Sequence, residues 1–265
     1  MIQQSNLQCL FNFAFFPKYE EAINKLATEI ASNDEEWDFS DVQTKKNAIL
    51  KNYLEHTFRK LKVENKISYT LQNTHACFNT GLLTNNLEEI FVFFEAHNGL
   101  YNKNGVPFCF KAFLRASDNR LLRIFSGNLP ETADYFQKPE DLIFNPNCNI
   151  IPQIDHIIEE NKDRFPLHMQ ELDSNEIRRR LEGAINEAKK KVKTNYKIAV
   201  PQFYNNRIQL LLPLYLTPSS QNPDLALVIH KVNATTYTAR TCLTLKMAYN
   251  NARLIVKPQS SWLKP

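Results

Sequence analysis

Residues 195–245 read NYKIAVPQFYNNRIQLLLPLYLTPSSQNPDLALVIHKVNATTYTARTCLTL and decide the fold of the C-terminal part of the chain. Apolar and β-branched residues gather there in four runs, at 195–200, 206–216, 224–232 and 236–245. Short polar connections separate the runs. This pattern predicts about four strands joined as an antiparallel meander.

The segment before these strands, 175–193, predicts an amphipathic helix beside the sheet. Its apolar residues form one stripe about 100° wide, made of Ile177, Leu181, Ala184, Ile185, Ala188 and Val192. The opposite ridge carries Arg179, Asn186, Lys190 and Lys193. We therefore predict an α+β fold, with a mostly antiparallel sheet packed against amphipathic helices.

The N-terminal part mixes helical and extended patterns. Helical spacing predicts helices at 18–31, 43–62 and 153–163. Extended patterns predict strands at 67–71, 75–79, 106–115 and 120–125, and a buried helix or strand at 87–96. No internal repeat is evident. We predict a mixed α/β part at 1–170 and a basic helix with an antiparallel sheet at 171–265, joined in one compact unit.

Positive charge is concentrated in the last third of the chain. Residues 176–265 hold 15 Lys or Arg against 4 Asp or Glu, a net charge of +11. Residues 1–175 hold 17 basic and 24 acidic residues, a net charge of −7, with the helix at 43–62 as a basic island. Such a division favours an anionic partner for one end of the molecule.

Glycine, cysteine and hydropathy patterns exclude several kinds of site. The 5 Gly are too dispersed for a Walker loop or a GxGxxG fingerprint. The 5 Cys form no CxxC pair, so we expect buried reduced thiols and no zinc site. No run approaches the roughly 20 apolar residues that span a bilayer. We expect a cytoplasmic protein without a metal or cofactor.

Six phrases in a fixed order carry a resemblance to a known family: 50–58 (LKNYLEHTF), 76–82 (ACFNTGL), 156–166 (HIIEENKDRFP), 196–202 (YKIAVPQ), 210–214 (LLLPL) and 247–254 (MAYNNARL). Together they resemble the bacterial family named domain of unknown function 3825, from about Trp37 to Trp262. The resemblance implies no established activity. Members that accompany small RNA-binding modules point toward RNA, and the last phrase is similar to the end of small RelE-like or barnase-like ribonucleases.

Seven basic residues are candidates for binding nucleic acid or another anion: Arg179, Lys190, Lys193, Lys197, Arg207, Arg240 and Arg253. For the helix ridge alone, a solvated face is the simpler interpretation. The excess continues after the helix with a single acid, Asp224, and this favours phosphate contacts. Arg240 is the most informative, because it lies in an apolar strand, where a charge needs a partner or a ligand.

Five residues are candidates for ligand contact: Asn79, Thr80, Gln209, Tyr249 and Asn250. The first two precede Gly81, where the backbone can approach a ligand closely. The alternative is a strand that ends in a turn, with Gly81 at positive φ and Asn79 in an Asx-turn. Gln209 lies in an apolar strand, where a polar side chain needs a partner.

His156 and Arg164 are the candidates for catalysis. His156 and Glu160 share a helix face, so the carboxylate can orient the imidazole. Arg164, just past the helix end, could bind a phosphate, and phosphodiester chemistry needs an acid or base beside a cationic group. The simpler interpretation is a helix-terminal Arg that satisfies carbonyls above a half-buried His.

Three hypotheses on function stay open. The first is an RNA- or single-stranded-nucleic-acid-binding protein whose C-terminal helix and sheet track phosphates while exposed aromatic rings stack on bases. The second is an enzyme acting on RNA or a nucleotide, a metal-independent phosphodiesterase with His156 and Arg164 in its site. The third is a homo-oligomer in which the acidic segment 1–42 faces the basic half of another copy.

Overall fold

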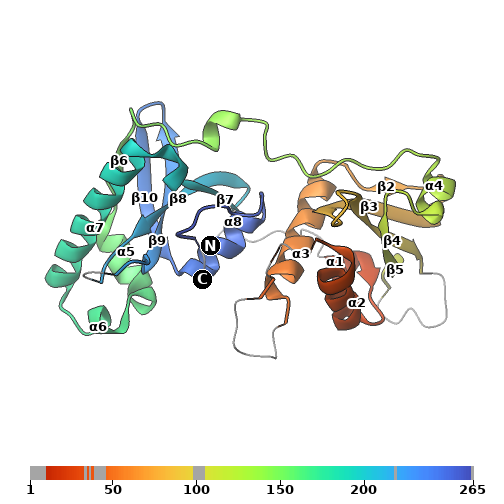
Figure 1. The fold of residues 1–265 in the computed structure, drawn as a ribbon, viewed down its shortest axis with the longest axis horizontal. Coiled ribbons are helices and arrows are strands. Elements are labelled where there is room, and N and C mark those ends of the chain that lie inside the picture. The colour runs from red at the N-terminus through yellow and green to blue at the C-terminus, as the bar shows by residue number, and fades with distance from the viewer. Residues whose placement is uncertain are drawn as a thin grey trace. The chain divides into compact units, whose positions relative to one another are not determined.

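The computed structural model describes residues 10–32, 35, 37–38, 46–97, 105–217 and 220–263. These residues form eight α-helices and two five-stranded sheets, so the α+β class is confirmed. The chain divides into two compact units, Met1–Asp134 (unit 1) and Tyr135–Pro265 (unit 2), with one sheet in each (Figure 1). Residues 43–45 of the predicted helix at 43–62, and most of 33–42, lie outside the described residues.

Unit 1 combines one sheet with helices on both of its faces. The helices are α1 (Leu10–Phe13), α2 (Tyr19–Lys25), α3 (Ala48–Val63) and α4 (Asn119–Phe125), with a π-helical turn at Leu26–Ile30. The strands are β1 (Ala14–Phe15), β2 (Ser68–Tyr69), β3 (His75–Leu83), β4 (Glu89–Ala96) and β5 (Phe108–Arg115). They lie in the order β1-β5-β4-β3-β2, with β1 parallel to β5 and the other pairs antiparallel.

Aromatic and aliphatic side chains fill both faces of the unit 1 sheet. On one face, Phe58 of α3 packs against Phe78 with ring centroids 5.6 Å apart, and Phe78 lies 5.9 Å from Phe94. On the other face, α4 completes a buried cluster of Cys77, Phe91, Phe93, Leu114, Leu121 and Phe125. Both faces of this sheet are therefore core.

Unit 2 has the same kinds of elements. Its helices are α5 (Ile154–Asn161), α6 (Leu167–Gln170), α7 (Ser174–Thr194) and α8 (Leu245–Arg253). Its strands are β6 (Asn149–Pro152), β7 (Val200–Tyr204), β8 (Arg207–Leu214), β9 (Leu225–Asn233) and β10 (Thr236–Leu243). The order is β6-β10-β9-β8-β7, with β6 parallel to β10 and the other pairs antiparallel.

The helices of unit 2 cover the two faces of its sheet unequally (Figure 1). α5 and α7 bury a common core with Leu210, Leu212 and Ile229 on one face. α7 does so with the stripe predicted from the sequence, all six residues of which are buried. α8 packs against the opposite face, where Asn251 donates a hydrogen bond to Gln202 of β7.

The two sheets share one topology although the sequence shows no repeat. In each, the first strand lies at an edge, parallel to the last strand, and the last four strands run antiparallel across the sheet. Helices follow the first strand in both units, and one helix, α4 or α8, follows the last. Strand pairing repeats without residue identity, because a sheet requires apolar residues at given positions and tolerates several kinds of them.

Three expectations about the fold differ from the structure. The C-terminal sheet is mixed and five-stranded, since the short strand β6, far from β10 in the sequence, adds a parallel edge. Residues 120–125 form α4 rather than a strand, because Asp118 accepts a hydrogen bond from the N–H of Arg120 and caps a helix. The units divide after Asp134 rather than at 170/171, because α5 belongs to the core of the C-terminal sheet.

Three observations on the described residues concern thiols, metals and membranes. Four cysteines are free thiols, namely Cys77, Cys109, Cys148 and Cys242. No group of three or more His, Cys, Asp or Glu side chains in the described part of the chain could hold a metal ion. None of the helices described is both long and apolar enough to cross a membrane.

Candidate nucleic-acid interface

A row of polar side chains crosses four neighbouring strands of the unit 2 sheet. Gln202 of β7 pairs with Gln209 of β8, and His230 of β9 pairs with Thr238 of β10. The register of β8 and β9 places Gln209 opposite His230. We refer to these four residues as the polar row.

The polar row lies on the face of the sheet opposite to α5 and α7. Leu210 and Ile229, which neighbour the row on β8 and β9, belong to the core beneath those helices. Because side chains alternate along a strand, Gln209 and His230 project from the other face. Helix α8 covers this face only in part: Gln202 is 1% exposed, whereas Gln209 and His230 are half-buried.

Two arginines add positive charge beside the row. Arg207 begins β8, and Arg240 lies at the irregularity between Ala239 and Thr241 of β10. Both are exposed, and neither forms an ion pair within the described part of the chain. Arg240 lies in a strand as predicted, but the strand irregularity leaves its side chain in solvent, so its charge does not need a partner inside the protein.

The charges of both arginines affect the pKa of His230. Its pKa is lowered first by burial and then by the charges of Arg207 and Arg240. Tyr204 of β7 pairs with Arg207 across the ladder and keeps 53% of its surface exposed. We refer to the polar row together with Tyr204, Arg207 and Arg240 as the polar face. It offers hydrogen-bond donors, positive charge and one aromatic ring.

A chain of amide groups links α8 to the polar face. Asn251 Nδ2 donates to Gln202 Oε1 at 3.2 Å. Gln202 Nε2 in turn donates to Gln209 Oε1 at 2.9 Å. The buried Gln202 thus accepts from the helix and donates toward the half-buried Gln209.

Unit 1 has apolar residues in the corresponding row. Cys77 of β3 pairs with Phe93 of β4, and Phe93 pairs with Ala112 of β5. This row faces α4, the helix after the last strand, as the polar row faces the side of α8. Phe93 is buried, and burial raises the pKa of the Cys77 thiol to about 12. A row across β3 and β4 is thus core in unit 1, whereas a row across the matching strands β8 and β9 of unit 2 is polar.

Several basic residues of α7, most of them beside the ridge, are paired with carboxylates. Its ion pairs are Arg178 with Asp155 and Glu182, Arg179 and Arg180 with Glu176, and Lys191 with Glu187. Lys190, Lys193 and the following Lys197 are exposed. Because α7 covers the face opposite to Arg207 and Arg240, the predicted anion-binding residues do not share one surface.

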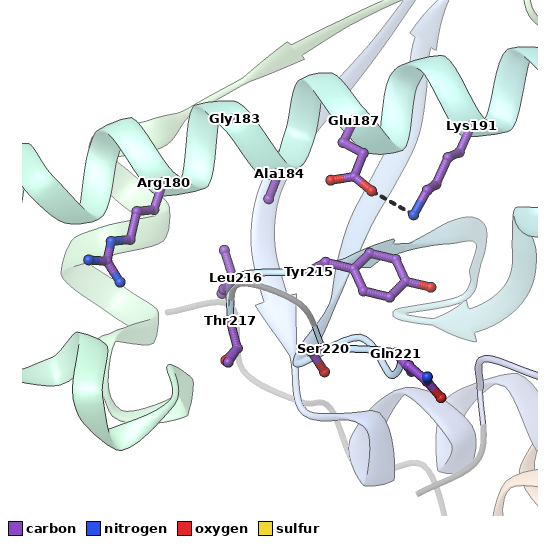
Figure 2. A pocket seen from close by; sticks show the side chains of 10 residues that line it. All are labelled: Arg180, Gly183, Ala184, Glu187, Lys191, Tyr215, Leu216, Thr217, Ser220 and Gln221. Atoms are coloured by element: carbon purple, nitrogen blue, oxygen red, sulfur yellow. Dashed lines mark ion pairs between the residues drawn. The ribbon is translucent and has the colours of Figure 1, made fainter.

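A groove of about 600 Å³ runs between α7 and the segment after β8 (Figure 2). Lys191 Nζ lies 3.9 Å from the centre of the Tyr215 ring and 2.6 Å from Glu187 Oε1. Gly183 keeps the helix side of the groove open, since nothing lies within 4 Å of the place its Cβ would take. The charge of Lys191 is therefore already balanced inside the groove.

The predicted contact residues of α8 are mainly internal. Arg253 and Tyr249 are each 5% exposed, so Arg253 does not lie on the anion-binding surface predicted from the sequence. It falls on the same buried stripe of the helix as Ala248 and Ala252. Asn250 is half-buried, and its buried Oδ1 has no hydrogen-bond partner among the residues that the structure describes.

The two predicted catalytic residues have separate sets of contacts. His156 Nε2 lies 3.3 Å from Glu160 Oε2, in a groove of about 540 Å³ that also contacts Arg178. Arg164 Nη1 donates to the carbonyl of Cys242 at 2.7 Å and to Thr241 Oγ1 at 3.3 Å. The guanidinium therefore satisfies a backbone carbonyl, as the simpler interpretation expects.

Asn79 and Thr80 are buried and support an irregularity in β3 rather than an open site. Asn79 Nδ2 donates to Glu89 Oε1 at 3.0 Å, and Asn79 Oδ1 accepts from the N–H of Gly81 at 2.9 Å. Thr80 Oγ1 donates to the carbonyl of Ile90 at 2.7 Å. Gly81 has a φ of +72°. These features are those of the alternative interpretation, an Asx-type bond with Gly81 at positive φ.

Sequence reasoning singled out Arg207, Gln209 and Arg240 but not Gln202, His230 or Asn251. The sequence contained one signal for them, a polar residue at an apolar strand. Gln202 and Gln209 each interrupt such a strand, and His230 directly follows the apolar run 225–229 (LALVI). Single polar residues in strands become a row only through the register, which the sequence leaves unspecified.

Comparisons with known proteins bear on the chain as a whole. Curated proteins give no match, and solved structures give none either. A family model described as Domain of unknown function (DUF3825) matches residues 28–262. The matched range includes the last four strands of unit 1, all five strands of unit 2 and every residue of the polar face. The chain therefore belongs to the DUF3825 family.

Proposed function

We propose that unit 2 binds single-stranded nucleic acid, RNA in the first place, on its polar face. The observation that carries the proposal is the grouping of Arg207, His230 and Arg240 on three strands of one sheet face. The two arginines have no carboxylate partner within the described residues. A phosphodiester supplies the opposite charge, and the release of its counterions favours binding.

The polar face suits this role better than the ridge of α7. On α7, three arginines and Lys191 already pair with carboxylates of the same unit, so a phosphate would have to displace them. On the polar face a phosphate meets two guanidinium groups that no carboxylate of the described residues neutralises. Lys190 and Lys193 lie on the other side of the sheet and can add long-range attraction without direct contact.

The shape of the face favours a single strand over a duplex. An extended strand can run across a sheet and place its bases flat on aromatic rings, as in several RNA-binding modules. Tyr204, exposed and adjacent to Arg207, supplies such a ring. The half-buried Gln209 and Thr238 lie where the backbone of that strand would pass.

The test measures the salt dependence of binding to a fluorescein-labelled oligouridine by anisotropy. We expect the Arg207→Ala/Arg240→Ala variant to bind at least tenfold more weakly. Its log K should fall less steeply with log salt than that of the unmodified protein, by about 0.7 for each phosphate that the variant no longer neutralises. The matched control is Arg179→Ala/Lys190→Ala, which removes the same charge from α7 and should retain most of the affinity.

Two outcomes contradict the proposal and point to the alternatives. If the protein binds no oligonucleotide but its mass at low salt exceeds that at high salt, charge-driven self-association is favoured. If total RNA or nucleotides are converted to products, and His156→Ala abolishes the conversion, the phosphodiesterase hypothesis is favoured. Because Arg164 is engaged by the carbonyl of Cys242, the geometry supports binding more than catalysis.

A further inference from the structure

We infer that Gln202 is a positioning residue, which holds Gln209 with its amino group toward a phosphodiester oxygen of the bound strand. The inference rests on the nucleic-acid binding proposed above and assigns the part of the ligand that this site contacts. It starts from one residue, because Gln202 is among the few polar side chains that are almost fully buried, at 1% exposure.

The direction of the amide chain follows from its hydrogen bonds. A primary amide has one oxygen that accepts and one nitrogen with two N–H donors. Gln202 receives a bond from Asn251 at its oxygen and gives one from its nitrogen to the oxygen of Gln209. The carbonyl of Gln209 is thereby directed inward, and its amino group is left for the open side of the sheet.

The groups around Gln209 define what it can meet. Arg207 and Arg240 are donors without an acceptor function, and Gln209 with its carbonyl engaged offers only N–H groups. The edge of a nucleobase mixes donors and acceptors, and its donors would find acceptors in His230 and Thr238 but none in these three groups. A non-bridging phosphate oxygen accepts from all three, and bonds from donors to a charged oxygen are the stronger kind. The ligand group is therefore the phosphodiester backbone.

Unit 1 shows that the sheet does not need this arrangement to form. At the corresponding pair of strands, Ser68 of β2 stands opposite Cys77 of β3, and neither can form an amide chain. The topology is the same without it. A buried, hydrogen-bonded glutamine in unit 2 is thus explained by what it does to Gln209.

The experiment is a double-mutant cycle on affinity for labelled oligouridine. Gln209→Ala removes the proposed contact, and Gln202→Met removes the group that orients it at similar volume. We expect each variant to bind about tenfold more weakly, as for loss of a hydrogen bond to a charged group. If Gln202 acts through Gln209, the double variant is also about tenfold weaker. A loss near the product of the two, about a hundredfold, would mean independent roles and overturns the inference.

A second variant covers the case in which Gln202→Met fails to fold. Gln202→Glu has the same shape and still accepts from Asn251, but cannot donate to Gln209. Gln209 must then turn its amino group inward and its carbonyl toward the phosphate. The added carboxylate also repels a phosphate, so we expect weaker binding in both backgrounds, and a larger loss in the otherwise unmodified protein than when residue 209 is Ala. Equal effects in both backgrounds overturn the inference.

The ligand group is tested with an oligouridine whose linkages are methylphosphonates, which lack the phosphate charge. The inference requires that Gln209→Ala has a smaller effect on the residual binding of this probe, because the remaining P=O oxygen is uncharged and a weaker acceptor; an undiminished effect overturns it. Failure of the inference and failure of the proposed function are separable. If Arg207→Ala/Arg240→Ala loses affinity while Gln209→Ala does not, only the amide arrangement is wrong. If both bind like the unmodified protein, the interface itself is wrong.

Discussion

Both faces of the unit 1 sheet are apolar core, whereas the unit 2 sheet has one apolar face and a second face divided between buried apolar residues, such as Leu211 and Val228, and the polar face. Both have the same strand order and a parallel edge strand. In both, a long helix, α3 or α7, packs on the first face. The same topology therefore forms whether the second face is buried throughout or only in part, and the part that stays uncovered is available for another use.

The largest expected effect comes from removing one side chain from matching strands of the two sheets, β4 and β9. Phe93→Ala should destabilise unit 1 by about 3–5 kcal/mol, because a buried ring is removed and a cavity remains. His230→Ala should change the stability of unit 2 by less than about 1 kcal/mol, since His230 is half-buried and outside the core. Hydrogen exchange measured on peptides from β4 and β9 separates the two units. Equal destabilisation would show that the polar row is core after all.

A smaller effect is expected at two glycines, one in each unit. Gly81→Ala should destabilise unit 1 by about 1–3 kcal/mol, because φ is +72° and a Cβ would lie 2.7 Å from Tyr53 Oη. Gly183→Ala in α7 should stabilise unit 2 by about 0.5–1 kcal/mol, because Ala is the better helix former and nothing lies close. Urea denaturation followed by circular dichroism measures both. A neutral Gly81→Ala variant would mean that β3 can straighten, as β8 does.

The smallest effect concerns the charge state of His230. Its pKa lies below 6.5, so the folded protein binds this proton less readily than the unfolded chain. The resulting stability is present above about pH 6.5 and is lost as the pH falls through the lower pKa of the folded protein. Removing the charges of Arg207 and Arg240 should raise the pKa only partly, because burial is the larger cause.

A titration of His230 followed by NMR measures this directly. Addition of oligouridine should raise the pKa, because a phosphate near the imidazole favours its charged form. An unchanged pKa in the presence of saturating oligonucleotide would place the ligand away from the polar face. The His156→Ala variant provides the control, since it leaves the strands of the sheet untouched.

The sequence predicted the local elements of unit 2 well and their assembly less well. The apolar run at 225–229 and the apolar stripe at 175–193 are strong local signals. The structure forms the strand β9 from the first and the helix α7 from the second. β6 has four residues and gains its stability from pairing with β10, which no local pattern reveals. For 120–125, a short apolar run fits a strand or a helix, and the cap at Asp118 decides.

The same holds for the candidate site: single residues were predicted from the sequence, and their arrangement was not. Charge counting found Arg207 and Arg240, but it placed them with the basic residues of α7 because sequence does not say which face of a sheet a helix covers. Arg253 has the charge of a surface residue and the position of a core residue, so composition alone misplaces it. The polar row needed the register of four strands before its members could be recognised as neighbours.

Asn161 and Arg164 have a consequence for how copies of this chain meet. The pairing of β10 with β6 ends at Ala239, which leaves the last part of β10 as an open edge. There Asn161 Oδ1 accepts from the N–H of Cys242 at 2.6 Å, and Arg164 donates to its carbonyl. These side chains occupy the groups with which a strand of another molecule would pair. The edge is closed to intermolecular strand addition, the route by which sheets aggregate.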